Sequence, residues 1–330
     1  MSATEITALD APRKGILTGA KNLIVGTLLA LTPVTALLVL GWIMRDMRRV
    51  AQAASGGGQT AVPGWGLNRD SEAAAGRWLG GLAANIREGL MAGLALALGT
   101  LPFAGFWITS WWAGWDNSFN KGYEQAFIGP ATGLLGLSIF MVMMVYLPMA
   151  QAHMAVENRL SAFFEFARIR SAARHAGLPQ LFWAFGLAFF SLPIFAARGL
   201  PTFVEGIIPG FADFTATQVQ DLQTLIALVM SAYIFATLLI FRRRQARIYA
   251  TAVGRARLTG DRELWAGTRL SAFANPQRAY RPNPLLRMVY FVVLMGIWWC
   301  VAAMIYVGQF LNHDWHVWLT HPLIFLPWMP

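Results

Sequence analysis

Long apolar runs recur along the chain and are separated by shorter polar and charged stretches. A helix needs about 20 largely apolar residues to cross a bilayer. Six segments meet or approach that length: 23–43, 90–112, 128–150, 181–197, 222–241 and 285–310. The pattern predicts an all-α polytopic integral membrane protein, a helical bundle with these six spans. The membrane domain would cover residues 23–310, between a polar N-terminal segment (1–22) and an external tail rich in Trp, His and Pro (311–330).

The first apolar segment leaves two interpretations open. Pro33 lies in the middle of this run, with Thr32 and Thr35 beside it. Proline removes a backbone donor and bends or breaks a helix. The segment could be a single span kinked at Pro33, or a broken, re-entrant hairpin. A break at membrane depth is tolerated where surrounding protein covers the freed backbone groups.

The composition supports a membrane protein over a soluble one. Hydrophobic residues make up 56% of the chain and charged residues only 13%, whereas about a quarter of a typical soluble domain is charged. This balance excludes a disordered chain and argues against a soluble globule. The single cysteine, Cys300, excludes a disulfide within the chain and a metal site built from several Cys ligands.

The positive charge is unevenly distributed. The formal net charge is +10, and arginine is concentrated in the loops 44–88, 151–180 and 242–284. Cytoplasmic loops carry such an excess of basic residues, which predicts a multi-pass protein of a bacterial inner membrane with these loops in the cytoplasm and the C-terminus in the periplasm. Basic blocks beside apolar segments favour anionic phospholipids as partners, not nucleic acid. The densest cluster is a predicted lipid-headgroup site: Arg242, Arg243, Arg244 and Arg247.

Two motifs point to a known family. The first motif begins at Gly41-Trp42, continues through Arg45, Asp46, Arg48 and Arg49, and is followed by Pro63-Gly64-Trp65-Gly66. The second motif begins at Leu147-Pro148-Met149-Ala150 and continues through Glu157, Phe163, Glu165 and Arg168. Together they resemble an uncharacterised family of multi-span prokaryotic membrane proteins, known as a domain of unknown function. The resemblance covers about residues 15–245. It implies a helical membrane fold and no particular activity.

Signatures of common catalytic chemistries are missing from the sequence. It contains no GxxxxGK[ST], HExxH, GxSxG or CxxC motif, so we expect a protein that is not an enzyme. The predicted spans hold essentially no ionisable residue in their middle, which argues against ion-coupled transport. The pair Gly89-x-x-x-Gly93 predicts close helix packing.

Histidine and tryptophan supply the remaining candidates for binding. His153, a few residues after the third span, could ligate a metal or porphyrin, or could be an interfacial side chain bonded to backbone or lipid. The tail contains three further candidate pigment or metal contacts, His313, His316 and His321, and three candidate docking residues, Trp315, Trp318 and Trp328. The tail could equally be an aromatic segment lying in the interface. No cofactor is certain; lipids, (bacterio)chlorophyll and carotenoid are the groups considered.

These features together favour a structural role. We expect a non-catalytic accessory, scaffold or assembly subunit of a bacterial membrane complex, with other integral membrane subunits as partners. A photosynthetic reaction-centre or light-harvesting assembly is one such complex. The alternative is a small-molecule transporter whose substrate path uses helices broken at Pro33, Pro102, Pro148 and Pro193.

Overall fold

The structure is a computed structural model that describes residues 17–58, 62–66, 79–112, 127–273 and 283–312. Every regular element in these ranges is a helix. A short N-terminal helix, Leu17–Leu29, is followed by α2 (Pro33–Ala54), α3 (Gly80–Trp112), α5 (Ile128–Glu157), η4 (Leu160–Phe164), α6 (Phe166–Ala176), α7 (Leu178–Ile207), η5 (Phe211–Asp213), α8 (Ala216–Leu258), η6 (Arg269–Ala272) and α9 (Pro284–Asn312). The all-α membrane fold expected from the apolar runs is confirmed.

The number of spans is smaller than the six expected. Four helices of the described residues, α3, α5, α8 and α9, are long and apolar enough to cross a membrane. A fifth span exists only if α6 and the first part of α7 count as one, and these two helices meet at an angle of 92°. The predicted span 181–197 therefore belongs to a sharply bent pair. The chain bends after Gly177, which has a φ of 67° that L side chains rarely adopt.

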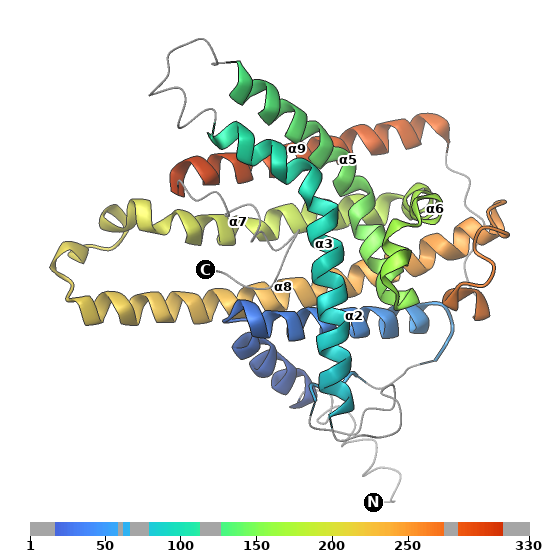
Figure 1. The fold of residues 1–330 in the computed structure, drawn as a ribbon, viewed down its shortest axis with the longest axis horizontal. Helices are drawn as coiled ribbons and strands as arrows, with labels where there is room; N and C mark the ends of the chain where they lie inside the picture. Colours follow the sequence, from blue (N-terminus) through green and yellow to red (C-terminus); the bar gives the residue numbers. More distant parts are fainter. Residues whose placement is uncertain (1–16, 59–61, 67–78, 113–126, 274–282, 313–330) are drawn as a thin grey trace, which may run out of the picture.

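The first predicted span, 23–43, is not continuous. The helix Leu17–Leu29 ends in a turn, and α2 begins at Pro33. Thr32 caps α2, because its side-chain oxygen accepts a hydrogen bond from the Thr35 amide at 3.3 Å. Of the two interpretations left open, the broken segment is the one observed, and the two helices enclose an angle in Figure 1.

The other expected helix breaks are not present. Helices α3, α5 and α7 run without interruption through Pro102, Pro148 and Pro193. Membrane helices tolerate proline because neighbouring groups satisfy the freed carbonyls. Of the four helix breaks expected at proline, only the one at Pro33 is therefore found, and the transporter alternative stays a prediction.

Helix α2 lies at the centre of the molecule. It packs against α3, α5 and α8, while α7 packs against α8 and α9. In Figure 1, α3 crosses α2 and α8 steeply and runs alongside α5. At the α2–α3 crossing, a Cβ atom on Gly41 or on Gly89 would lie nearer than 3.0 Å to backbone of the opposite helix. The close packing predicted for Gly89 is thus found, with Gly41 as its partner.

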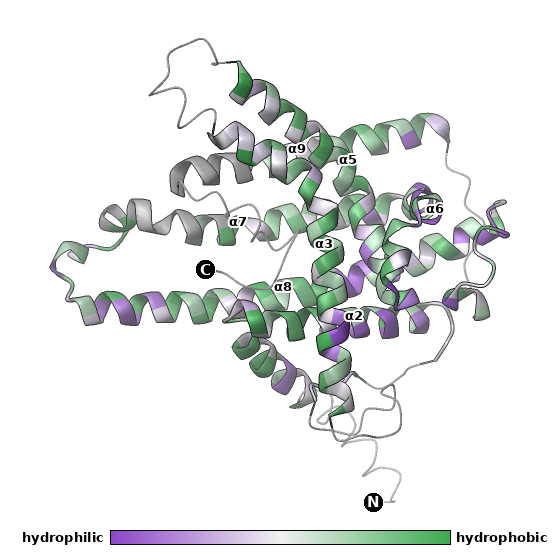
Figure 2. Cartoon of the chain, viewed as in Figure 1, coloured by the Kyte–Doolittle hydropathy of each residue, from purple (hydrophilic) through white to green (hydrophobic). Residues whose placement is uncertain are grey.

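Helix α2 is largely buried and nevertheless carries several charges. The second half of α2 carries Arg45, Asp46, Arg48 and Arg49, and the first three are buried. Figure 2 shows hydrophilic residues gathered where α2, α3, α5 and α8 meet, whereas the coloured part of α9 is largely apolar. The fold therefore encloses a polar core at the meeting point of its helices.

Candidate functional site: a buried polar core

Two buried acids fix α2 to its neighbours. Asp46 accepts hydrogen bonds from Arg49, one turn along the same helix, at 2.8 and 3.0 Å, and from Arg243 of α8 at 2.5 Å. Glu88 of α3 forms an ion pair with Arg48. A charge buried in protein is stable only when it is paired and hydrogen-bonded, and both acids meet this condition.

Arginine side chains of α2 also bind backbone carbonyls of other elements. Arg45 donates to the side-chain oxygen of Asn85 at 3.0 Å, and Arg48 donates to the carbonyl of Ala155 in α5 at 2.9 Å. Trp42 donates its indole N–H to the carbonyl of Pro63 at 2.8 Å, and its ring stacks on Trp65 at 4.6 Å. The two family motifs are therefore in direct contact, because Arg48 of the first bonds to the helix that carries the second.

A chain of three side chains links α5, α6 and α8. His153 is fully buried, and its Nδ1 lies 2.7 Å from the hydroxyl of Tyr249. Its Nε2 lies 2.7 Å from a carboxylate oxygen of Glu165, which also binds Arg168 at 2.6 Å and pairs with Arg159. Glu165 occupies the N-cap position of α6, one residue before that helix begins, and its side chain bonds to His153 and the arginines instead of the helix backbone. The bend in the chain after α5 thus brings Glu165 back over His153.

The protonation state of His153 follows from the charge of Glu165. Burial alone would raise the pKa of Glu165, but hydrogen bonds from His153, Arg168 and Arg159 outweigh burial and lower that pKa to about 2. An ionised carboxylate only accepts hydrogen bonds, so Nε2 of His153 carries a proton and donates. Nδ1 then accepts from the Tyr249 hydroxyl in the neutral imidazole. Tyr249 is only 1% exposed, so its hydroxyl is not accessible to a substrate in this arrangement. The three hydrogen-bonded side chains orient the helices that carry them.

The segment after α8 closes the site from outside. Trp265 packs edge-on against His153, with ring centroids 5.6 Å apart, and donates to the Ser171 hydroxyl at 3.2 Å. Ser171 in turn donates to Asp261 at 2.5 Å. Glu157 accepts from the backbone amide of Arg269 at 3.0 Å. This segment therefore covers His153 and Glu157 with protein.

The four arginines predicted to bind lipid are separated by the fold. Arg242 is buried, and Arg243 is bonded to Asp46 inside the polar core. Arg244 and Arg247 are exposed. A headgroup could contact only these last two, since the other two side chains serve the interior.

The other predicted binding residues fall into two groups. His153 lies in the core with both ring nitrogens hydrogen-bonded, so in this arrangement neither is free to ligate a metal or pigment. The tail residues lie outside the described residues: His313, His316, His321, Trp315, Trp318 and Trp328. Within the part of the chain that the structure describes, no group of three or more His, Cys, Asp or Glu could hold a metal ion.

Several residues of the core were not identified from the sequence. Tyr249, Asn85 and Glu88 belong to no motif, and each meets its partner only in the folded chain. One signal was available for Asp46: an acid among three positive residues of one helix is an expected ion-pair partner.

The fold and the polar core define a polytopic helical membrane protein whose spans are joined by buried ion pairs. Within this class, the chain belongs to DUF4013, a family described as a protein of unknown function, which matches residues 24–204. This match confirms the family resemblance drawn from the two motifs. Searches of curated proteins and of solved structures find no significant match.

Proposed function

We propose that this protein is a non-catalytic accessory or scaffold subunit of a bacterial membrane complex. The observation that carries the proposal is the pairing of three acids of the polar core with arginine. Asp46, Glu88 and Glu165 are each bonded to at least one arginine. A catalyst or an ion-coupled transporter needs a group that exchanges protons or ligands, whereas these acids are committed to holding helices in place.

The outward face of α7 offers a surface for partners. Phe182, Phe185 and Phe189 recur at intervals of three and four residues, so they lie on one side of the helix. They are 71%, 61% and 59% exposed. Aromatic side chains are enriched in the contact surfaces between proteins, and a bilayer leaves this stripe facing either acyl chains or a neighbouring subunit. The scaffold proposal assigns it to a subunit.

Gentle extraction of the native protein tests this role. We expect stoichiometric integral membrane proteins to migrate with it on a native gel, as identified by mass spectrometry. Replacing Phe182, Phe185 and Phe189 by Ala should release them. A matched control replaces Val289, Val292 and Val293, which are exposed on α9, and should retain them. A lone monomer or homodimer of the native protein would overturn the proposal.

The absorption spectrum of the same band tests the finer assignment. A photosynthetic complex would show pigment bands at the position of the protein on the gel. This assignment depends on the tail 311–330, of which residues 313–330 lie outside the described residues. A colourless complex with defined partners would support the scaffold role and exclude the photosynthetic one.

A further inference from the structure

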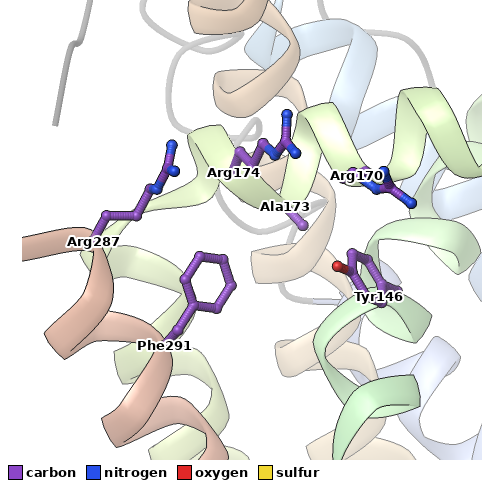
Figure 3. A pocket seen from close by; sticks show the side chains of 6 residues that line it. All are labelled: Tyr146, Arg170, Ala173, Arg174, Arg287 and Phe291. Atoms are coloured by element: carbon purple, nitrogen blue, oxygen red, sulfur yellow. The ribbon is translucent and has the colours of Figure 1, made fainter. Parts of the chain in front are cut away.

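A pocket between α5, α6 and α9 is lined by three arginines and lies apart from the polar core. Its volume is about 340 Å³, and its walls are formed by Tyr146, Arg170, Ala173, Arg174, Arg287 and Phe291. In Figure 3, Arg287 and Phe291 rise from α9 on one side, and Arg170 and Arg174 come from α6. The Tyr146 hydroxyl points into the space between these two sides. The three arginines thus come from two helices and line one cavity.

The charge of this pocket is not compensated within the part of the chain that the structure describes. Arg170, Arg174 and Arg287 are exposed, and none of them has an ion pair or a side-chain hydrogen bond there. Arg170 and Arg174 are four residues apart on α6, where like charges repel each other. The nearest acid along the chain, Glu165, is already bound by Arg168 and Arg159. Three positive charges around this cavity therefore lack an acidic partner among the described residues.

The shape and chemistry of the cavity specify which kind of anion. Guanidinium groups bind phosphate oxygens through paired, charge-assisted hydrogen bonds. The volume equals roughly ten water molecules, since each takes about 30 Å³ in the liquid, so the pocket exceeds a single inorganic phosphate. Phe291 supplies an apolar wall beside the arginines. A phosphate ester with an organic part fits these conditions.

The pocket lies beside the start of a helix that is long and apolar enough to cross the membrane. Arg287 lies in the first turn of α9, whose apolar span begins at Pro284. Exposed apolar side chains of the same helix follow directly, among them Met288 and Val292. Basic pockets between membrane helices bind anionic lipid headgroups. A headgroup in the pocket would leave its acyl chains along this face of α9.

We infer that the pocket formed by Arg170, Arg174, Arg287 and Tyr146 binds a phosphate-bearing headgroup. Two sources share this chemistry: an anionic phospholipid and a soluble phosphate ester. This site is distinct from Arg242–Arg247, because none of those residues lines the pocket, and it does not depend on the scaffold role.

Lipid retention and ligand stabilisation test the inference together. The full chain is purified in mild detergent, and the lipids that remain bound are measured by native mass spectrometry. The delipidated protein is then titrated with dioleoylphosphatidylglycerol and, separately, with inorganic pyrophosphate. Its Tm is recorded in both titrations. The pocket variant carries Arg170→Gln, Arg174→Gln and Arg287→Gln. The control variant carries Lys21→Gln, Arg262→Gln and Arg269→Gln, which removes the same charge from exposed positions outside both the pocket and the Arg242–Arg247 cluster.

We expect the pocket variant to lose the ligand and the control variant to keep it. Each lost charge-assisted contact should weaken binding about tenfold. Tyr146→Phe, which preserves packing, should weaken binding by a smaller factor. Stabilisation by the phospholipid alone identifies a lipid source, and stabilisation by pyrophosphate identifies a soluble one. Equal loss in the pocket and control variants, or no loss in the pocket variant, overturns the inference.

Discussion

Glu165 joins three other side chains at the junction between α5 and α6. It receives hydrogen bonds from His153 and Arg168, pairs with Arg159, and occupies the N-cap position of α6. Removing its charge leaves both arginines without this counterion, which costs stability because the ion pairs are partly buried. The stability of the junction between α5 and α6 should therefore be sensitive to this one carboxylate.

The substitution Glu165→Gln keeps the size of the side chain and removes its charge. We expect it to lower the free energy of unfolding by about 1–3 kcal/mol, because two arginines lose their counterion. Thermal unfolding in detergent measures the change. Glu263→Gln is the matched control, since Glu263 is exposed and has no ion pair in the described part of the chain. A variant at position 165 as stable as this control would contradict the prediction.

The same carboxylate predicts a dependence of stability on pH. Its pKa is about 2 in the folded protein and 4.5 in its ordinary range. A group whose pKa is lowered by folding stabilises the folded state above its unfolded pKa, and this contribution disappears as the pH falls through the folded value. The Tm difference between the native protein and Glu165→Gln should be constant above pH 5 and shrink between about pH 4.5 and pH 2. A difference that stays constant down to pH 2 would assign the effect to packing instead.

At the scale of helices, the crossing of α2 and α3 decides how closely the polar core can assemble. Gly41 and Gly89 let the two backbones approach, and this brings Arg48 to Glu88 and Arg45 to Asn85. Small residues play this part between membrane helices because packing, and not exclusion of water, drives their association. The contacts of Arg48 and Arg45 with α3 therefore depend on two glycines, Gly41 and Gly89.

Gly41→Ala and Gly89→Ala should each destabilise the protein strongly. The new Cβ atom would lie nearer than 3.0 Å to the backbone of Asn85 or Leu37, so the helices must separate and the buried charges lose contact. We expect a loss of at least 2 kcal/mol, measured by unfolding in detergent. Gly105→Ala in α3 is the control. Nothing lies within 4 Å of its Cβ position, and alanine favours a helix over glycine by about 1 kcal/mol. Unfolding of all three variants at the same denaturant concentration would refute the role of the crossing.

The sequence predicts the helices better than it predicts their partners. Apolar runs specify α3, α5, α8 and α9, since about 20 apolar residues in succession are a local property. The ends of α5 and α8 lie beyond those runs, at Glu157 and Leu258, because buried polar contacts stabilise these extensions. Asp46 and Arg243 are 197 positions apart, so no periodicity in the sequence could join them. Distant pairing also explains why the arginines of loop 242–284 were expected at a lipid surface, although two of them face the interior.

At the scale of the whole molecule, polar chemistry is concentrated at one end of the spans. The polar core joins the ends of α2, α5 and α8, and the three-arginine pocket lies where α6 meets the start of α9. The opposite ends of α7 and α8 are connected through η5, which carries one acid, Asp213. Arginine-rich segments remain on the cytoplasmic side of a membrane. The fold thus predicts that the polar core faces the cytoplasm and η5 faces the periplasm.

Labelling of single cysteines tests this orientation. Cys300 is exposed and is first replaced by Ser. Asp213→Cys and Arg262→Cys then place one thiol on an exposed position at either end of α8, a helix of 43 residues. An impermeant maleimide should label Asp213→Cys in spheroplasts and Arg262→Cys only after lysis, because the excess of arginine near position 262 keeps that end in the cytoplasm. The reverse pattern would invert the topology, and labelling of both positions before lysis would show that α8 does not cross the membrane.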